Sequence, residues 1–156
     1  MKSNIKWPWS GKYEIWSIKN NKRKKIADID NLIVNWAKNT LATALMGTDY
    51  VMENVKIKYL AIGDDNTAPL GSDSTLVNEV FRTPFVSQSN TSTGEITSEF
   101  YILDSDYSGS IKEIGLFGGN SATATTDTGN LLSRALWSYT KSASEEIYIK
   151  RIDTIS

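Results

Sequence analysis

Two short apolar segments, which carry one or two charges each, constrain the fold of this chain most strongly. Residues 111–117 read Ile-Lys-Glu-Ile-Gly-Leu-Phe, and residues 131–137 read Leu-Leu-Ser-Arg-Ala-Leu-Trp. Runs of this length, bounded by glycine and polar clusters, are typical of β-strands that are at least half buried. Residues 118–130, which join them, are nearly all turn and loop formers. The two segments therefore predict a β scaffold in which each strand charge has a partner, because an unpaired buried charge is costly.

The rest of the chain shows further strand patterns and one helix pattern. Residues 36–46 place apolar side chains on one helical face, between Asn35 as a candidate N-cap and Gly47 just past the helix end. Pro84 favours an edge strand or a bulge, and Ile152 interrupts an alternating pattern, which predicts a bulge or strand end there. Strands are expected over residues 12–18, 24–30, 56–62, 80–86, 96–102 and 147–150.

These patterns predict a mainly β protein, an antiparallel β-sandwich of about eight strands with one packed α-helix over residues 35–46. Residues 12–156 are expected to form this single domain, and residues 1–11 an extended N-terminal arm.

The composition excludes the commonest catalytic chemistry. The 156 residues include no Cys and no His, which removes disulfides, thiolate metal sites and nucleophiles activated by histidine. No apolar run approaches the roughly 20 residues of a membrane helix, and the N-terminus lacks an apolar stretch of the signal-peptide type. We therefore expect no catalytic, cofactor-binding or metal-binding residues, no cofactor and no membrane contact.

Charge is distributed unevenly along the chain. Residues 1–38 hold nine Lys or Arg against three Asp or Glu, whereas residues 39–156 hold eight against fifteen. The basic cluster at residues 22–25 is a candidate patch for nucleic acid or an acidic protein, and a solvated hairpin turn is the simpler interpretation, since two asparagines precede it.

The tryptophans near the N-terminus suit docking on a neighbouring subunit, core packing or ligand stacking. The expected interface residues are Trp7, Trp9, Trp16, Lys22, Arg23, Lys24 and Lys25.

Acidic residues offer few alternatives for chemistry. Residues 104–109 resemble the start of a calcium-binding loop. Such a loop needs a carboxylate at its twelfth position to complete the coordination shell, and here that position is Gly115. Asp64 and Asp65 form a loop pair with no further acid placed to join them, so a solvated turn is favoured. Four charges in apolar strand contexts are instead expected to form partly buried structural ion pairs: Glu79, Arg82, Glu113 and Arg134.

Five segments in order resemble a known family. They cover residues 31–46, 59–69, 75–82, 111–117 and 131–135, and together they are similar to tailed-bacteriophage virion proteins of the tail-fibre base, baseplate or collar. The resemblance covers roughly residues 30–155. It implies a non-enzymatic connector or attachment module in the virion, a homo-oligomer whose partners are other virion proteins rather than nucleic acid.

Two other function classes remain open. A carbohydrate-binding β-sandwich module would be favoured by Trp7, Trp9 and Trp16 lying coplanar on an open surface. A small hydrolase would be favoured by a deep cleft holding two carboxylates about 5–10 Å apart.

Overall fold

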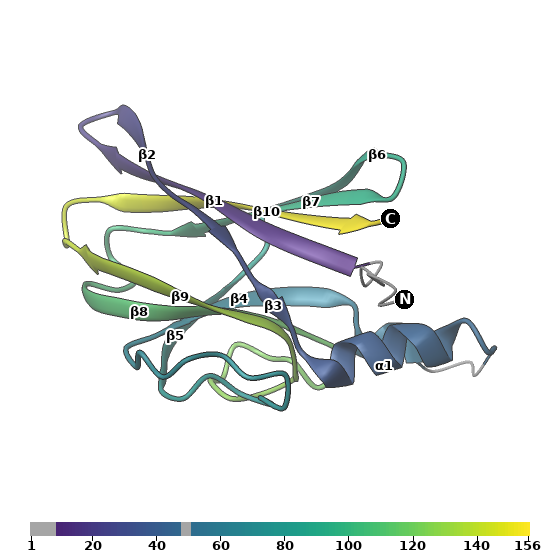
Figure 1. Ribbon diagram of the computed structural model, residues 1–156. Helices are drawn as coiled ribbons and strands as arrows, with labels where there is room; N and C mark the ends of the chain where they lie inside the picture. Colours follow the sequence, from purple (N-terminus) through teal and green to yellow (C-terminus); the bar gives the residue numbers. More distant parts are fainter. Residues whose placement is uncertain (1–8, 48–50) are drawn as a thin grey trace, which may run out of the picture.

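The computed structural model describes residues 9–47 and 51–156. Within these ranges the chain forms two antiparallel sheets of five strands each, which pack face to face (Figure 1). The predicted mainly β sandwich is confirmed. Its strands are β1 (Trp9–Lys19), β2 (Lys22–Asp30), β3 (Leu32–Ile33), β4 (Ile57–Gly63), β5 (Glu79–Pro84), β6 (Ser87–Ser92), β7 (Glu95–Ile102), β8 (Gly109–Gly118), β9 (Asn130–Lys141) and β10 (Glu146–Ile155). Its helices are α1 (Asn35–Ala44) and α2 (Val51–Asn54).

The strand orders define two layers. One layer, the β1 sheet, runs β2-β1-β10-β7-β6, and the other, the β8 sheet, runs β3-β9-β8-β4-β5. Ile15, Ile149 and Phe100 are cross-strand partners in one row of the β1 sheet. All three side chains are fully buried, as are Ile114 and Leu116 of β8. The core therefore lies between the two sheets, where alternate residues of each strand meet.

The β1–β2 hairpin shows how local turn chemistry fixes a register. Asn20 and Asn21 have φ values of 49° and 59°, the left-handed conformation that asparagine tolerates and that two-residue hairpin turns require. The turn pairs Lys19 with Lys22 and Ile18 with Arg23. The hairpin expected from residues 12–18 and 24–30 is therefore present.

The β8 sheet is covered on both faces. Ile114 and Leu116 belong to the core between the sheets. The alternate residues Glu113, Gly115 and Phe117 face a second layer formed by long loops. Glu113 accepts hydrogen bonds from loop backbone, Gly115 lies close to Leu76, and Phe117 lies under a guanidinium group. A strand buried on both faces reads as a continuous apolar run, which explains the sequence of residues 111–117.

Two strands were not predicted from the sequence, and the boundary of the arm is wrong. The described residues contain ten strands rather than about eight, because the two-residue β3 and the wholly polar β6 carry no apolar alternation. The arm predicted over residues 1–11 extends too far, since β1 begins at Trp9 and pairs with the end of β10 from its first residue. Residues 1–8 lie outside the described residues.

Helix α1 forms where the sequence predicts it, with a different first turn. The N-cap position is Val34, which makes no side-chain capping bond, and Asn35 is the first helical residue. The backbone N–H of Asn35 instead donates to the carbonyl of Gly71 at 2.8 Å. Ala37 and Thr40 are the buried residues of the helix. A loop carbonyl therefore replaces the asparagine cap that the sequence suggested, and it ties α1 to residues 64–78.

The two outer strands of the β1 sheet differ in chemistry. β2 begins with four consecutive cations, all of them exposed, at Lys22, Arg23, Lys24 and Lys25. β6, at the opposite edge, reads Ser-Gln-Ser-Asn-Thr-Ser and is exposed along its whole length. Natural sheets protect their edges with charge, above all with lysine. Only the β2 edge of this sheet carries that protection.

Candidate functional site

A buried ion pair lies at the centre of the outer face of the β8 sheet. The Nε of Arg134 on β9 donates to Oε2 of Glu113 on β8 at 2.8 Å, and both side chains are at most 1% exposed. The register sets Arg134 opposite Gly115, which has no side chain to occupy this face. Two members of the predicted set of ion-pair residues are thus direct partners.

The remaining hydrogen-bonding groups of this pair hold the loop of residues 64–78. Arg134 donates to the Thr67 carbonyl at 2.7 Å and to the Asp73 carboxylate at 2.9 Å. Glu113 accepts the backbone N–H groups of Val77 at 3.2 Å and Asn78 at 2.9 Å. Burial alone would lower the pKa of Arg134, but its bonds to Asp73 and Glu113 raise it. Through these hydrogen bonds the pair contacts residues near both ends of a fifteen-residue loop.

Gly63 at the end of β4 makes room for this arrangement. A Cβ at this position would collide with the Glu113 carboxylate and lie 2.5 Å from the backbone carbonyl of Asn78. We expect Gly63→Ala to lower the free energy of unfolding by about 1–3 kcal/mol, the usual range for overpacking. A urea titration measures this change, and a loss below about 0.5 kcal/mol would show that the loop yields without strain.

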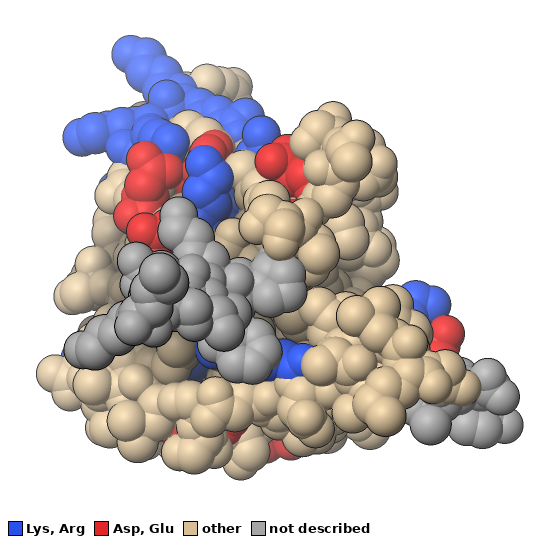
Figure 2. All heavy atoms as spheres, turned by 45° about the vertical axis from the view of Figure 1, so that its right-hand side comes forward, with Lys and Arg blue, Asp and Glu red and all other residues tan. Residues whose placement is uncertain are grey.

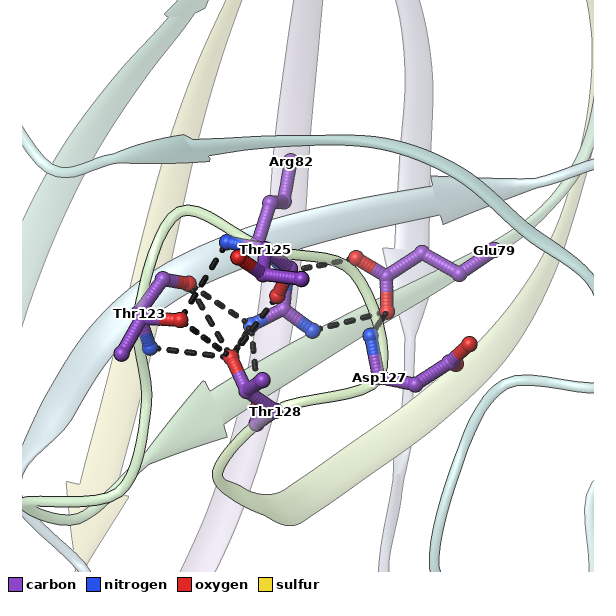
Figure 3. A network of polar contacts seen from close by, with 6 residues as sticks. All are labelled: Glu79, Arg82, Thr123, Thr125, Asp127 and Thr128. Atoms are coloured by element: carbon purple, nitrogen blue, oxygen red, sulfur yellow. Dashed lines mark hydrogen bonds and ion pairs between the residues drawn. The ribbon is translucent and has the colours of Figure 1, made fainter.

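A second buried ion pair holds the other long loop. Arg82 on β5 donates to both oxygens of Glu79 at 2.5 and 2.7 Å. The same guanidinium donates to the carbonyls of Thr123 at 3.1 Å and Thr128 at 2.8 Å, and Glu79 accepts the backbone N–H of Asp127 at 3.0 Å. Figure 3 shows this network, in which one arginine and one glutamate bind the loop of residues 119–129 from one side. The Arg82 guanidinium also lies 4.5 Å above the Phe117 ring.

The two loops meet the start of α1 around a groove of about 460 Å³. Residues 71–74, residues 129–131, Asn35 and Trp36 line it. Trp36 is 42% exposed, unlike Trp9 and Trp137, which are buried. We name residues 64–78 and 119–129, together with Asn35 and Trp36, the loop platform. Figure 1 shows its two loops on the side of the β8 sheet that faces away from the β1 sheet.

The predicted interface residues do not form one surface. Trp9 is wrong as an interface residue, because it is only 8% exposed and its Nε1 donates to the buried Asp153 at 2.8 Å. Trp7 lies outside the described residues. Trp16 is half-buried on the outer face of the β1 sheet. The guanidinium of Arg23 lies 4.6 Å from the Trp16 ring and 3.9 Å from the Tyr148 ring, so an arginine already covers this aromatic surface.

The four basic interface residues gather on the hairpin. Lys22, Arg23, Lys24 and Lys25 are exposed, and Figure 2 shows Lys and Arg side chains concentrated at the top of the molecule over this hairpin. Lys25 pairs with Asp28 at 2.7 Å on the outer face. The hairpin is therefore a basic projection at a distance from the loop platform.

A third buried ion pair, on β10, was not predicted from the sequence. Arg151 and Asp153 of β10 point between the sheets, and the guanidinium donates to the carboxylate at 2.6 and 3.0 Å. Arg151 also donates to Ser133 at 3.2 Å and packs 4.7 Å from the Tyr13 ring. With its amide oriented to suit its neighbours, Asn31 accepts from Arg151 and Ser133. The bulge or strand end expected at Ile152 is wrong, because β10 continues to Ile155.

The acidic residues considered for chemistry have structural roles. Asp65 accepts the backbone N–H of Thr67 at 2.7 Å, and Asp64 accepts the side-chain amide of Asn78 at 2.5 Å. Asp106 accepts the backbone N–H of Leu103 at 2.8 Å within a turn. Across residues 9–47 and 51–156, no three acidic side chains gather closely enough to hold a metal ion. In the same ranges, no helix has the length and apolar character to cross a membrane.

Comparisons of the chain with protein-family models, with curated proteins and with solved structures found no match. A functional interpretation rests on three features of the structure: the two long loops, the arginines that hold these loops, and the groove beside Trp36.

Proposed function

We propose that this chain is a non-enzymatic structural connector of a phage virion or a phage-derived particle, which joins tail, neck or baseplate to fibres or neighbouring subunits. One observation carries the proposal: two buried ion pairs hold both long loops in fixed positions around a groove with an exposed tryptophan. The sequence resemblance to virion proteins points to the same role.

Fixed loops suit a binding surface that must recognise one partner. A loop that is ordered before association loses little conformational entropy when it binds. Here each loop is held by a guanidinium and a carboxylate that contact its backbone, so the hold does not depend on the loop's exposed side chains. The exposed residues of the loops remain available to a partner.

Trp36 is the residue we assign as the anchor of this surface. Tryptophan is enriched among the few residues that dominate interface energies, especially when it fills a pocket near the interface centre. Trp36 stands at the first turn of α1, beside a groove large enough for a side chain of the partner. A connector would bury this ring against the neighbouring subunit.

The same geometry supports a non-enzymatic role. Glu79 and Glu113 are the fully buried carboxylates that hold the two loops of the platform. Each accepts hydrogen bonds from an arginine and from backbone N–H groups. These donors occupy the oxygens of both side chains, which are shielded from solvent, so neither carboxylate is free to contact a substrate.

We expect Trp36→Ala to leave the fold intact and to remove the chain from assembled particles. The reason is that Trp36 is 42% exposed in the single chain and buried in the proposed contact, where loss of such an anchor costs about 2 kcal/mol or more. The measurement is the amount of the chain in particles purified from cells that express the variant as the sole copy. Circular dichroism of the isolated variant confirms that it folds.

Leu103→Ala provides the matched control, because Leu103 is also 42% exposed and lies outside the loop platform. If Leu103→Ala is incorporated into particles normally and Trp36→Ala is absent from them, the result supports the loop platform as the attachment surface. Normal incorporation of both variants would refute it.

A further inference from the structure

A second groove lies at the other end of the sandwich, between the β1–β2 hairpin and strand β9. Its volume is about 520 Å³, within the range of roughly 300–1,000 Å³ typical of small-molecule sites. The hairpin contributes Lys19, Lys22 and Lys24 to the lining, and β9 contributes Tyr139. The loop platform shares no residue with this groove.

Two of the three lysines carry charges that no carboxylate neutralises within the described part of the chain. Lys19 lies 3.6 Å from Glu145, so its charge has a partner. Lys22 and Lys24 form no ion pair with any described carboxylate, whereas Lys25, on the opposite face of the hairpin, pairs with Asp28. A concave surface lined by unneutralised cations concentrates the local field and attracts anions.

The tyrosine gives the groove a rigid aromatic wall. The Tyr139 ring stacks on Trp137, with ring centroids 5.7 Å apart and planes inclined by 7°. Its hydroxyl donates to Glu145 at 2.8 Å. Both contacts fix the ring, which therefore presents a preformed apolar surface next to the two lysines.

The buried Glu145 carboxylate beneath the groove does not oppose an anion strongly. It accepts hydrogen bonds from Ser17 at 2.5 Å, from the backbone N–H of Ser142 at 2.7 Å and from Tyr139. Burial would raise the pKa of Glu145, but these bonds and Lys19 lower it. Its negative charge is therefore satisfied within the protein, and Lys22 and Lys24 determine the sign of the groove.

We propose that this groove binds a saccharide unit that carries a phosphate or carboxylate group. Lys22 and Lys24 donate hydrogen bonds to the anion, and the Tyr139 ring packs against the apolar face of the sugar. A single aromatic wall suits one sugar ring. A single-stranded nucleic acid uses several stacking residues along a track, and an extended acidic peptide needs no aromatic wall. The groove can act in this way whether or not the chain belongs to a virion.

Isothermal titration calorimetry on the whole chain tests the assignment with defined polymers. Phosphomannan supplies a sugar phosphate, polygalacturonate supplies a sugar carboxylate, and neutral dextran supplies sugar without charge. We expect binding of one or both anionic polymers and none of dextran. Polyglutamate serves as an anion without a saccharide, and oligothymidylate serves as an anion with a nucleic-acid backbone. Both should bind more weakly than the anionic polysaccharide.

Lys24→Gln and Lys25→Gln are a matched pair, since neighbouring residues of one strand point to opposite faces. Lys24→Gln should weaken binding about tenfold, the effect of one charge-assisted hydrogen bond, and Lys25→Gln should change it less than about twofold. Tyr139→Leu should also weaken binding of the polysaccharide while leaving binding of polyglutamate unchanged. Equal losses in the two lysine variants, equal affinity for polyglutamate or oligothymidylate, or no binding of either anionic polysaccharide would each overturn the proposal.

Discussion

Replacing Arg134 by Met is expected to lower the free energy of unfolding by about 3–5 kcal/mol, the typical loss when one member of a buried ion pair is removed. The substitution leaves the buried Glu113 carboxylate with only the backbone N–H groups of Val77 and Asn78 as donors. It also frees the Thr67 carbonyl and Asp73. Urea unfolding at neutral pH measures the loss, and hydrogen exchange should become faster at the amides of Val77 and Asn78.

A double-mutant cycle measures the interaction free energy between Glu113 and Arg134 apart from their contacts with other residues. Glu113→Gln should also destabilise the domain, and the double variant with Arg134→Met should lose less than the sum of the two, because contacting residues are coupled. Lys12→Met, which removes an exposed partner of Glu14 at 3.2 Å, is the control and should cost at most about 1 kcal/mol. Additive losses below about 0.5 kcal/mol for Glu113→Gln and for Arg134→Met would place both residues among ordinary surface charges.

Arg151→Met should cause a loss of similar size, about 3–5 kcal/mol, from a different part of the molecule. Arg151 is fully buried between the sheets, and Asp153 depends on it and on Trp9 for hydrogen bonds. The same urea titration reports the change. In contrast to Arg134→Met, the exchange of the Val77 and Asn78 amides should change only through global unfolding.

Lys150→Met is the matched control for Arg151→Met. Lys150 precedes Arg151 on β10, and its side chain lies on the outer face of the sheet, opposite Glu14 and Glu99 in the register. We expect a change within about 0.5 kcal/mol for this variant. If the two variants lose the same amount, the Arg151 cluster does not stabilise the sandwich.

The sequence predicted those parts of the fold that depend on one strand or one turn. A continuous apolar run with one acid or one arginine inside it was enough to predict both strands and a partner for Glu113 and Arg134. The asparagine turn predicted the first hairpin. In each case the pattern follows directly from burial or from backbone conformation, and neither requires knowledge of distant segments.

The parts that the sequence did not predict depend on contacts between distant segments. β6 has no apolar alternation, and it becomes a strand because β7 offers its backbone for pairing. The charges of Arg151 and Asp153 look like the end of an alternating pattern. They continue it, because Trp9, Asn31 and Ser133 provide partners between the sheets. The groove beside Trp36 forms only when two loops and a helix converge.

The unlike edges of the β1 sheet limit how copies of this chain could join through their strands. The β2 edge carries four cations and two acids, so it is net positive and disfavours another β2 edge, whereas two β6 edges are uncharged and can pair through backbone hydrogen bonds. Pairing of β6 with β6 is isologous, so it uses the same edge on both copies. The joined sheet then ends in a β2 strand on each side, and growth stops at two copies. Because only one edge of the sheet is uncharged, assembly through this sheet gives a closed dimer instead of an open fibre.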